Sequence, residues 1–315
     1  MDRECWNAGG AGSVKPAVAI VGPGRVGQSV GRLLRSAGYP VSAVVGRDLD
    51  ATRSAAVFIG ADLMATTCLE RCSASRAIFL TVPDDSLVAT IDELSRVELH
   101  PGTLLIHCSG LHTTEVFSPL CPAEHQLQTL ALHPLQAFAS PTAGYAALPG
   151  SYCSLQGETQ ALERGHEIVA DLACRSFVIC AEDKVRYHAA ACMVSNYVTT
   201  LIDAACELCK DMVSQAVLAP GPKSPPLAEM FPAAFAPLIQ AAVHNTLSVG
   251  AQHALTGPVA RADVGTVAAH LEEIRTACPE ILPVYRALAH HTVAVALKGG
   301  HLDEAAAQTL RSILA

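Results

Sequence analysis

The chain has 315 residues, of which 50% are hydrophobic and 16% charged, and its formal net charge at pH 7 is −8. This length accommodates two domains of about 100–200 residues each. The mild acidity disfavours nucleic acids and anionic membranes as partners, and we find no apolar run of the ~18 residues that a membrane-spanning helix needs.

The chain begins with residues 1–15, which contain Gly, Ser and Asn but no hydrophobic segment. We interpret them as a disordered lead-in rather than a signal peptide, and therefore expect a cytoplasmic protein. In that compartment the twelve cysteines are expected to act mainly as small hydrophobic residues. The closest pair, Cys206 and Cys209, has no second Cys or His pair at zinc-site spacing, so we expect neither disulfides nor a metal site.

A short apolar run at residues 18–21 leads into a glycine-rich turn and then into a segment with helical periodicity. In the pattern G-x-G-x-x-G, the first glycine permits a tight turn, the second lets the backbone approach a pyrophosphate, and the third lets the helix pack on the strand. The N–H groups of the helix N-terminus then face the phosphates. We therefore predict a dinucleotide site formed by Gly22, Pro23, Gly24, Arg25, Val26 and Gly27.

The end of the next expected strand, residues 41–45, indicates which dinucleotide binds. Arg47 follows this strand and Arg53 lies further along the next helix. A guanidinium group suits the 2′-phosphate of NADP because it donates two hydrogen bonds at once. Asp48 would serve the ribose of NAD if it pointed inward. We expect NADP(H), bound with Arg47 and Arg53, and keep NAD as the less favoured alternative.

Apolar runs alternate with helical segments to about residue 180, which predicts an α/β Rossmann domain at residues 16–180 with a mostly parallel sheet. The expected strands are residues 18–21, 41–45, 77–82, 103–107, 127–132, 151–155 and 175–180. Ligands bind beyond the carboxyl ends of such strands. We therefore expect the loops there to supply cofactor contacts from Val82, Pro83 and Asp84, and substrate contacts from Ser109, Gly110 and His133.

From residue 181 to 315 the periodicity is helical, which predicts an all-helical second domain that helps bind substrate. The expected helices are residues 184–213, 227–249, 264–277, 279–297 and 302–314. Their apolar arcs are wider than a small monomeric bundle can bury, so we expect a homodimer formed through this domain.

The first of these helices carries the residue types that proton transfer requires. In one continuous helix, Lys184, His188 and Asn196 would address the same side. A lysine near a nicotinamide can protonate a carbonyl oxygen, and a histidine can orient the substrate or relay the proton. A solvated Lys184 and a packed His188 are the structural alternatives.

Two residues further along are candidates for contacts with a small-molecule substrate. Arg261, in a loop rich in small residues, suits a bidentate contact with a carboxylate, and Asn245 can face the same pocket. Asp263, directly before an expected helix, is placed as its N-cap.

A dinucleotide domain followed by a long helix that opens on Lys184 resembles the superfamily of β-hydroxyacid dehydrogenases, 6-phosphogluconate dehydrogenase and ketopantoate reductase. The resemblance implies that Lys184 is the catalytic acid–base. His188 stands where that superfamily has a substrate-binding asparagine.

A second resemblance covers nearly the whole chain, through VPDDSL (82–87), HCSG (107–110), HPLQAF (133–138), YHAAACMVSNY (187–197) and ALTGPVARADVGTVAAHL (254–271). These motifs resemble the Rossmann-like family with a C-terminal domain of unknown function 2520, except that Arg261-Ala262-Asp263 replaces the usual Arg-Gly-Asp. This resemblance implies an NADP-oxidoreductase-like first domain and a helical second domain like that of 6-phosphogluconate dehydrogenase.

Together, these features predict NADP(H)-dependent reduction of a small carboxylate-bearing oxo acid, of the ketopantoate or β-hydroxyacid kind. Two alternatives stay open: reduction of an imine, as in pyrroline-carboxylate reductase, and a non-catalytic NADP sensor or scaffold.

Overall fold

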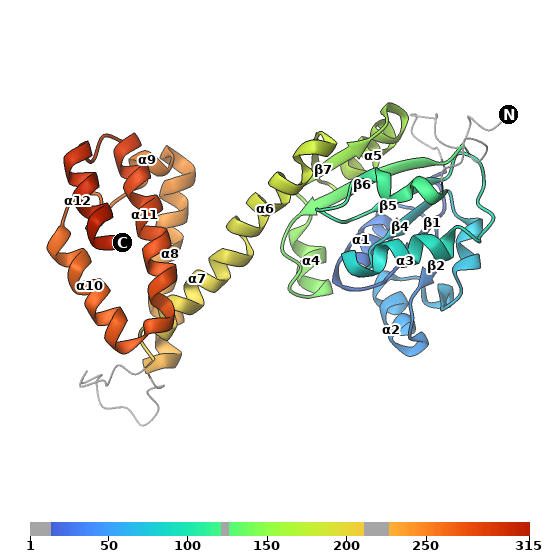
Figure 1. The fold of residues 1–315 in the computed structure, drawn as a ribbon. Coiled ribbons are helices and arrows are strands. Elements are labelled where there is room, and N and C mark those ends of the chain that lie inside the picture. The colour runs from blue at the N-terminus through green and yellow to red at the C-terminus, as the bar shows by residue number, and fades with distance from the viewer. Residues whose placement is uncertain (1–13, 121–125, 211–226) are drawn as a thin grey trace, which may run out of the picture. The chain divides into compact units, whose positions relative to one another are not determined.

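The computed structural model describes residues 14–120, 126–210 and 227–315 (Figure 1). The chain divides into two units, Met1–Ser195 and Asn196–Ala315. The sequence places the start of the helical domain near residue 181, whereas helix α6 (Lys184–Val194) is part of the first unit. Each unit has its own hydrophobic core.

The first unit is built on an eight-stranded sheet with the order β3-β2-β1-β4-β5-β6-β7-β8. Neighbouring strands are parallel except β6 and β7, which are antiparallel, so the predicted mostly parallel sheet is confirmed. The strands are β1 (Val18–Val21), β2 (Val41–Val45), β3 (Ala65–Thr66), β4 (Ala77–Leu80), β5 (Leu104–His107), β6 (Gln128–Leu135), β7 (Tyr152–Gly157) and β8 (Arg175–Val178).

Both faces of the sheet are covered, as Figure 1 shows. Successive residues of a strand point to opposite faces, and on β1 Val18 and Ile20 enter one core while Ala19 and Val21 enter the other. The first core also contains residues of α1 (Arg25–Ser36), α2 (Leu49–Ile59) and α5 (Thr159–Asp171). The second contains residues of α3 (Asp84–Leu94) and of the 3₁₀ helix Thr114–Leu120. A further short helix, α4 (Pro141–Ala147), follows β6.

Strand β6 is longer than its apolar run suggests. It extends through His133 and Pro134 to Leu135, so the prediction that His133 follows the strand is wrong. Pairing with β5 ends at Ala131, whereas pairing with β7 continues to Leu135. Pro134 is tolerated because this part of β6 is paired on one side only, where a missing N–H costs little.

The predicted single helix over residues 184–213 is also wrong. Ser195, with φ −119° and ψ −76°, separates α6 from α7 (Asn196–Glu207), and residues 211–213 lie outside the described part of the chain. Serine tolerates such a break because its side chain competes for backbone hydrogen bonds. Neither proline nor glycine is present at this position to indicate the break in the sequence. The argument that placed Asn196 on the same face as Lys184 therefore fails, because it assumed one continuous helix.

The second unit is helical, as predicted. Its elements after α7 are α8 (Leu227–Val249), α9 (Ala251–Ala254), α10 (Val264–Ala277), α11 (Leu282–Lys298) and α12 (Glu304–Leu314). Asp263 caps α10 by accepting the N–H of Thr266 at 3.0 Å, so the predicted N-cap is confirmed. Asp303 likewise caps α12, because its carboxylate accepts the N–H of Ala306 at 2.8 Å. Helix α12 therefore begins at Glu304, two residues later than predicted.

Within the described residues, one helical stretch is long and apolar enough to cross a membrane by length and composition alone. It is Ala181–Glu207, with a mean hydropathy of 1.2 over an 18-residue window. This stretch corrects the expectation that no apolar run reaches the length of a membrane-spanning helix. A single stretch of this kind is weak support for a membrane span, because helices of soluble proteins pass the same test.

Candidate cofactor and substrate site

The glycine-rich turn after β1 is shaped by contacts with β4 and the residues that follow it. Gly22 has φ +80°, and a Cβ atom there would lie 2.5 Å from Cγ1 of Val82. A Cβ on Gly27 would lie 2.4 Å from Oγ1 of Thr81, whereas one on Gly24 would meet nothing closer than 4.0 Å. The geometric reasons predicted for Gly22 and Gly27, a tight turn and close packing, are confirmed. Gly24 leaves open space beside it, and its approach to a pyrophosphate stays a prediction.

Helix α1 offers an N-terminus that is free to attract an anion. Gly24 makes no side-chain cap, and the first turn of α1 has no acidic residue. In contrast, α2 is capped by Asp48 and has Asp50 in its first turn, and α3 begins with Asp84 and Asp85. Helix N-termini attract anions through their N–H groups and dipole, and nearby carboxylates cancel that attraction. Strand β1 lies between β2 and β4, where the strand order reverses and where such sheets bind ligands.

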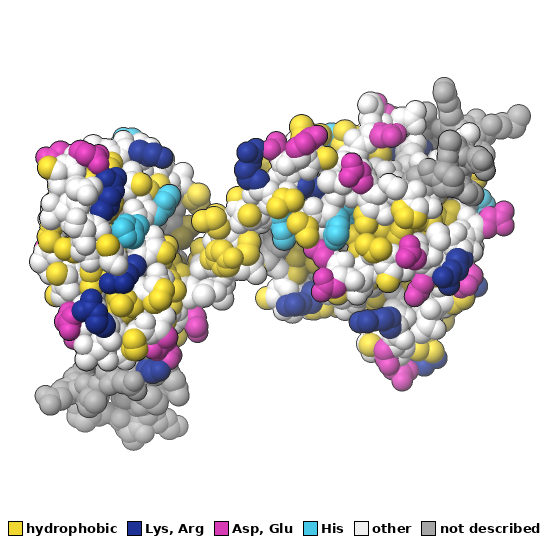
Figure 2. All heavy atoms as spheres, viewed as in Figure 1, with side chains coloured by type: hydrophobic (Ala, Val, Ile, Leu, Met, Phe, Trp, Pro, Cys, Tyr) yellow, Lys and Arg dark blue, Asp and Glu magenta, His cyan; other side chains and the backbone are white. Residues whose placement is uncertain are grey.

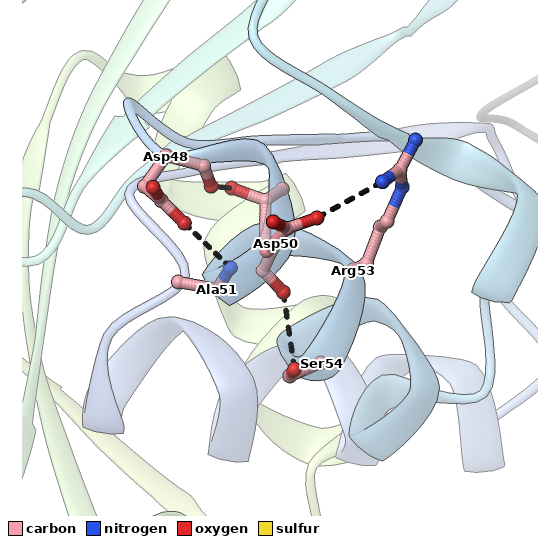
Figure 3. Close-up of polar contacts among 6 residues, drawn as sticks. Asp48, Asp50, Ala51, Arg53 and Ser54 are labelled. Carbon is pink, nitrogen blue, oxygen red and sulfur yellow. Dashed lines mark hydrogen bonds and ion pairs between the residues drawn. The ribbon is translucent and has the colours of Figure 1, made fainter.

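Both arginines predicted to hold a 2′-phosphate follow β2, and Figure 3 shows the contacts of Asp48 and Arg53. Oδ1 of Asp48 accepts the N–H of Ala51 at 2.7 Å, and Nη1 of Arg53 pairs with Oδ1 of Asp50 at 2.9 Å. Arg47 is exposed and forms no hydrogen bond or ion pair with any described residue. The Asp48 carboxylate is therefore already engaged, while the guanidinium of Arg47 is available.

Lys184, the first residue of α6, is buried rather than solvated, with 1% of its surface exposed. Its Nζ donates a hydrogen bond to the backbone carbonyl of Ser109 at 2.9 Å, joining α6 to the loop after β5. Burial lowers the pKa of Lys184 to about 8, although the charges of Cys108 and Asp84 act in the opposite direction. Its ammonium group is thus a stronger acid than an exposed lysine.

The loop after β5 carries Ser109 and Gly110 and brings Gly110 against two other predicted residues, His133 and His188. Oγ of Ser109 accepts the N–H groups of Leu111 and His112 at 3.1 and 3.0 Å, so only its proton is available to a ligand. A Cβ on Gly110 would lie 2.3 Å from Cδ2 of His188 and 3.0 Å from Nε2 of His133. Only glycine leaves room for both imidazole rings at this position.

The two imidazoles also contact one another, with ring centroids 5.6 Å apart and planes at 88°. Nδ1 of His133 lies 3.1 Å from the hydroxyl of Tyr187, a neighbour of His188 on α6. Burial, followed by the positive charge of Lys184, lowers the pKa of His133 to about 4, so this imidazole is neutral at pH 7. Sequence reasoning missed Tyr187, although it opens the motif that contains His188.

Asn196, Asn245 and Arg261 lie in the second unit. Asn196 begins α7, Asn245 is in α8 and Arg261 precedes α10, and all three are exposed. Their predicted contacts with substrate stay predictions.

The fold and the glycine-rich turn define a Rossmann-type domain. Residues 6–134 match the family model of a Rossmann-like domain, and residues 151–292 match that of a domain of unknown function, DUF2520. The chain therefore joins a Rossmann-like domain to a DUF2520 domain, which confirms the family resemblance of its motifs.

Solved structures share this fold. A candidate NADP oxidoreductase from Bacteroides fragilis is similar over 88% of this chain and 97% of that one, at 18% identity and a TM-score of 0.69. A Thermotoga maritima protein is similar over 89% and 98%, at 21% identity and a TM-score of 0.59. An imine reductase from a Pseudomonas species is similar over 95% and 99%, at 20% identity and a TM-score of 0.54. No curated protein matches the chain.

Proposed function

We propose that the protein is an NADP(H)-dependent oxidoreductase that reduces a small carboxylate-bearing oxo acid. The observation that carries this proposal is a buried lysine, Lys184, beside His133 and His188, in the same unit as a dinucleotide turn. The turn fits the cofactor, because Gly24 leaves open space and α1 begins without a cap or an acidic residue.

NADP is favoured over NAD by the turn after β2. The carboxylate that would bind the ribose 2′-hydroxyl of NAD belongs to Asp48, which instead caps α2. Arg47 is placed next to it with a guanidinium that no described residue engages. Arginine is suited to a phosphate because of its fork of N–H donors.

A bound NADPH would supply a hydride to the carbonyl carbon, which with one proton yields the alcohol and NADP⁺. Lys184 supplies that proton to the carbonyl oxygen, exchanging its bond with Ser109 for one with the substrate, and regains a proton from water. Its pKa of about 8 leaves it mostly protonated at pH 7 while lowering the cost of giving the proton away. His133 and His188 border Gly110 and orient the substrate.

A non-catalytic sensor or scaffold is the second candidate, and the enclosure of Lys184 favours it. In a sensor, the ammonium group of Lys184, which is 1% exposed and bonded to a backbone carbonyl, would hold the loop after β5 and take no part in chemistry. The two candidates differ in whether Lys184 affects turnover. An imine substrate would use the same proton donor as an oxo acid.

The test is a screen of oxo acids and cyclic imines for NADPH oxidation, with Lys184→Met as the variant. Methionine fills a similar volume without a proton to give, so we expect turnover to fall by ~10²–10⁴ while NADPH affinity is retained. In the unsubstituted protein the rate of reduction should fall above pH 8, because the ammonium form of Lys184 is then lost. Oxidation of NADPH that is equally fast in Lys184→Met would contradict the role of Lys184 as proton donor, and oxidation that is absent for every compound would favour the sensor.

A further inference from the structure

Tyr187 presents a hydroxyl group that the proposed reaction does not use. Its Oη lies 3.1 Å from Nδ1 of His133, and the two rings meet edge to face with centroids 5.7 Å apart. On another side, the ring of Phe177 from β8 lies 5.8 Å away at 74°. The Tyr187 ring is therefore held against residues of β6 and β8, with its hydroxyl at the imidazole.

The other nitrogen of His133 lies at Gly110. Its Nε2 is 3.0 Å from the position that a Cβ on Gly110 would take, and the ring of His188 stands at 88° to that of His133. One nitrogen of His133 is thus committed to Tyr187. The second borders the loop where Ser109 accepts the hydrogen bond of Lys184.

Which nitrogen carries the proton decides what His133 offers at Gly110. A neutral imidazole has one N–H donor and one acceptor nitrogen, and the hydrogen bond made by one nitrogen selects the tautomer. His133 is neutral at pH 7, because burial and the charges of Lys184 and His188 hold its pKa well below the ordinary value. Burial also raises the pKa of Tyr187, so its hydroxyl keeps its proton and can donate it.

We propose that Tyr187 is a positioning residue that donates its hydroxyl proton to Nδ1 of His133 and thereby fixes the Nε2–H tautomer. His133 then offers an N–H donor beside Gly110 to an anionic or carbonyl oxygen. In the opposite tautomer, a lone pair on Nε2 would face that position and repel a carboxylate. The choice of ligand class rests on the proposed function, whereas the tautomer is a property of the protein alone.

The experiment is ¹⁵N NMR of the full-length protein with labelled histidine, at pH 7 and without ligand, with the signals of His133 assigned by their loss in His133→Gln. We expect a protonated Nε2 and an unprotonated Nδ1. In Tyr187→Phe both signals should shift towards a mixture of tautomers. The matched control is Tyr152→Phe, which removes a hydroxyl from β7 that accepts from Arg175 at 3.2 Å and should leave His133 unchanged.

A protonated Nδ1 in the unsubstituted protein would overturn the inference, even if Tyr187→Phe failed to fold. Signals that do not move in Tyr187→Phe, or that move equally in Tyr152→Phe, would also overturn it. Turnover does not enter this measurement. A protein that shows the Nε2–H tautomer but reduces no oxo acid supports the inference and contradicts the proposed function. A protein that reduces an oxo acid but has a protonated Nδ1 supports the proposed function and contradicts the inference.

Discussion

At the scale of single residues, the backbone of Ala262 adopts a left-handed conformation with φ +54°, as do those of Gln126 and Ala173. This conformation brings Cβ close to a carbonyl oxygen and costs a non-glycine residue about 1–2 kcal/mol. The family that the chain resembles has glycine here. The strain lies between Arg261, a predicted substrate residue, and Asp263, which caps α10.

We predict that Ala262→Gly stabilises the protein. Relief of strain should exceed the loss from a more flexible unfolded chain, which is about 0.4–1 kcal/mol, and leave a net gain of roughly 0.5–1 kcal/mol. The measurement is chemical denaturation, with Ala268→Gly on the exposed face of α10 as the control, which should lose about 1 kcal/mol. A destabilised Ala262→Gly would show that the left-handed conformation is not strained.

The residues that the sequence predicted best act through local geometry or belong to a motif of fixed spacing. Asp263 has a role set within three residues of a helix start. Gly22 and Gly27 contact Val82 and Thr81, far along the chain, but the spacing of the glycine motif identified them. The burial of Lys184 was not predictable, because it depends on Ser109, 75 positions away in the chain. The link between Tyr187 and His133 spans 54 positions and was missed for the same reason.

At the scale of elements, periodicity located every described strand except the two-residue β3, and most helices, but not their interruptions. Helices α8 and α10 have the predicted bounds. The extension of β6 through Pro134 went unseen because it depends on pairing with β7. The break at Ser195 went unseen because no proline or glycine marks it in the sequence. The start of α2 is the element boundary that bears most directly on the proposed preference for NADPH, since Arg47 and the capping residue Asp48 are neighbours there.

We predict that Arg47→Ala weakens NADPH binding by roughly tenfold or more and leaves NADH binding unchanged, because it removes a charged hydrogen bond to the 2′-phosphate. Titration of nicotinamide fluorescence measures both affinities. Arg53→Ala is the matched comparison and should have a smaller effect, since Arg53 already pairs with Asp50. An unchanged preference for NADPH over NADH in Arg47→Ala would refute the assignment.

At the scale of the whole molecule, the second unit exposes large hydrophobic side chains. Tyr197 and Leu201 on α7 are 59% and 44% exposed, and Leu238 and Leu247 on α8 are 69% and 82% exposed. Hydrophobic side chains gather on the surface over α7 in Figure 2. A monomeric protein rarely leaves such a surface uncovered, which supports the proposed homodimer.

We predict a dimer in sedimentation at micromolar concentration, weakened by Leu247→Asp because a charge would have to be buried in the interface. Leu63→Asp, on an equally exposed leucine of the first unit, should leave the dimer intact. A stable monomer at this concentration would contradict the proposal.

The enclosure of Lys184 has a consequence for covalent chemistry. An amine with a pKa of about 8 is uncharged in roughly a tenth of molecules at pH 7, and an uncharged amine readily condenses with the carbonyl group of an oxo acid. An exposed lysine of this kind would become trapped as a Schiff base. Donation to the Ser109 carbonyl directs the Lys184 nitrogen at the backbone. Burial, which lowers the pKa of Lys184, also restricts access to its nitrogen, so an oxo acid reaches it only by replacing the Ser109 carbonyl as hydrogen-bond acceptor.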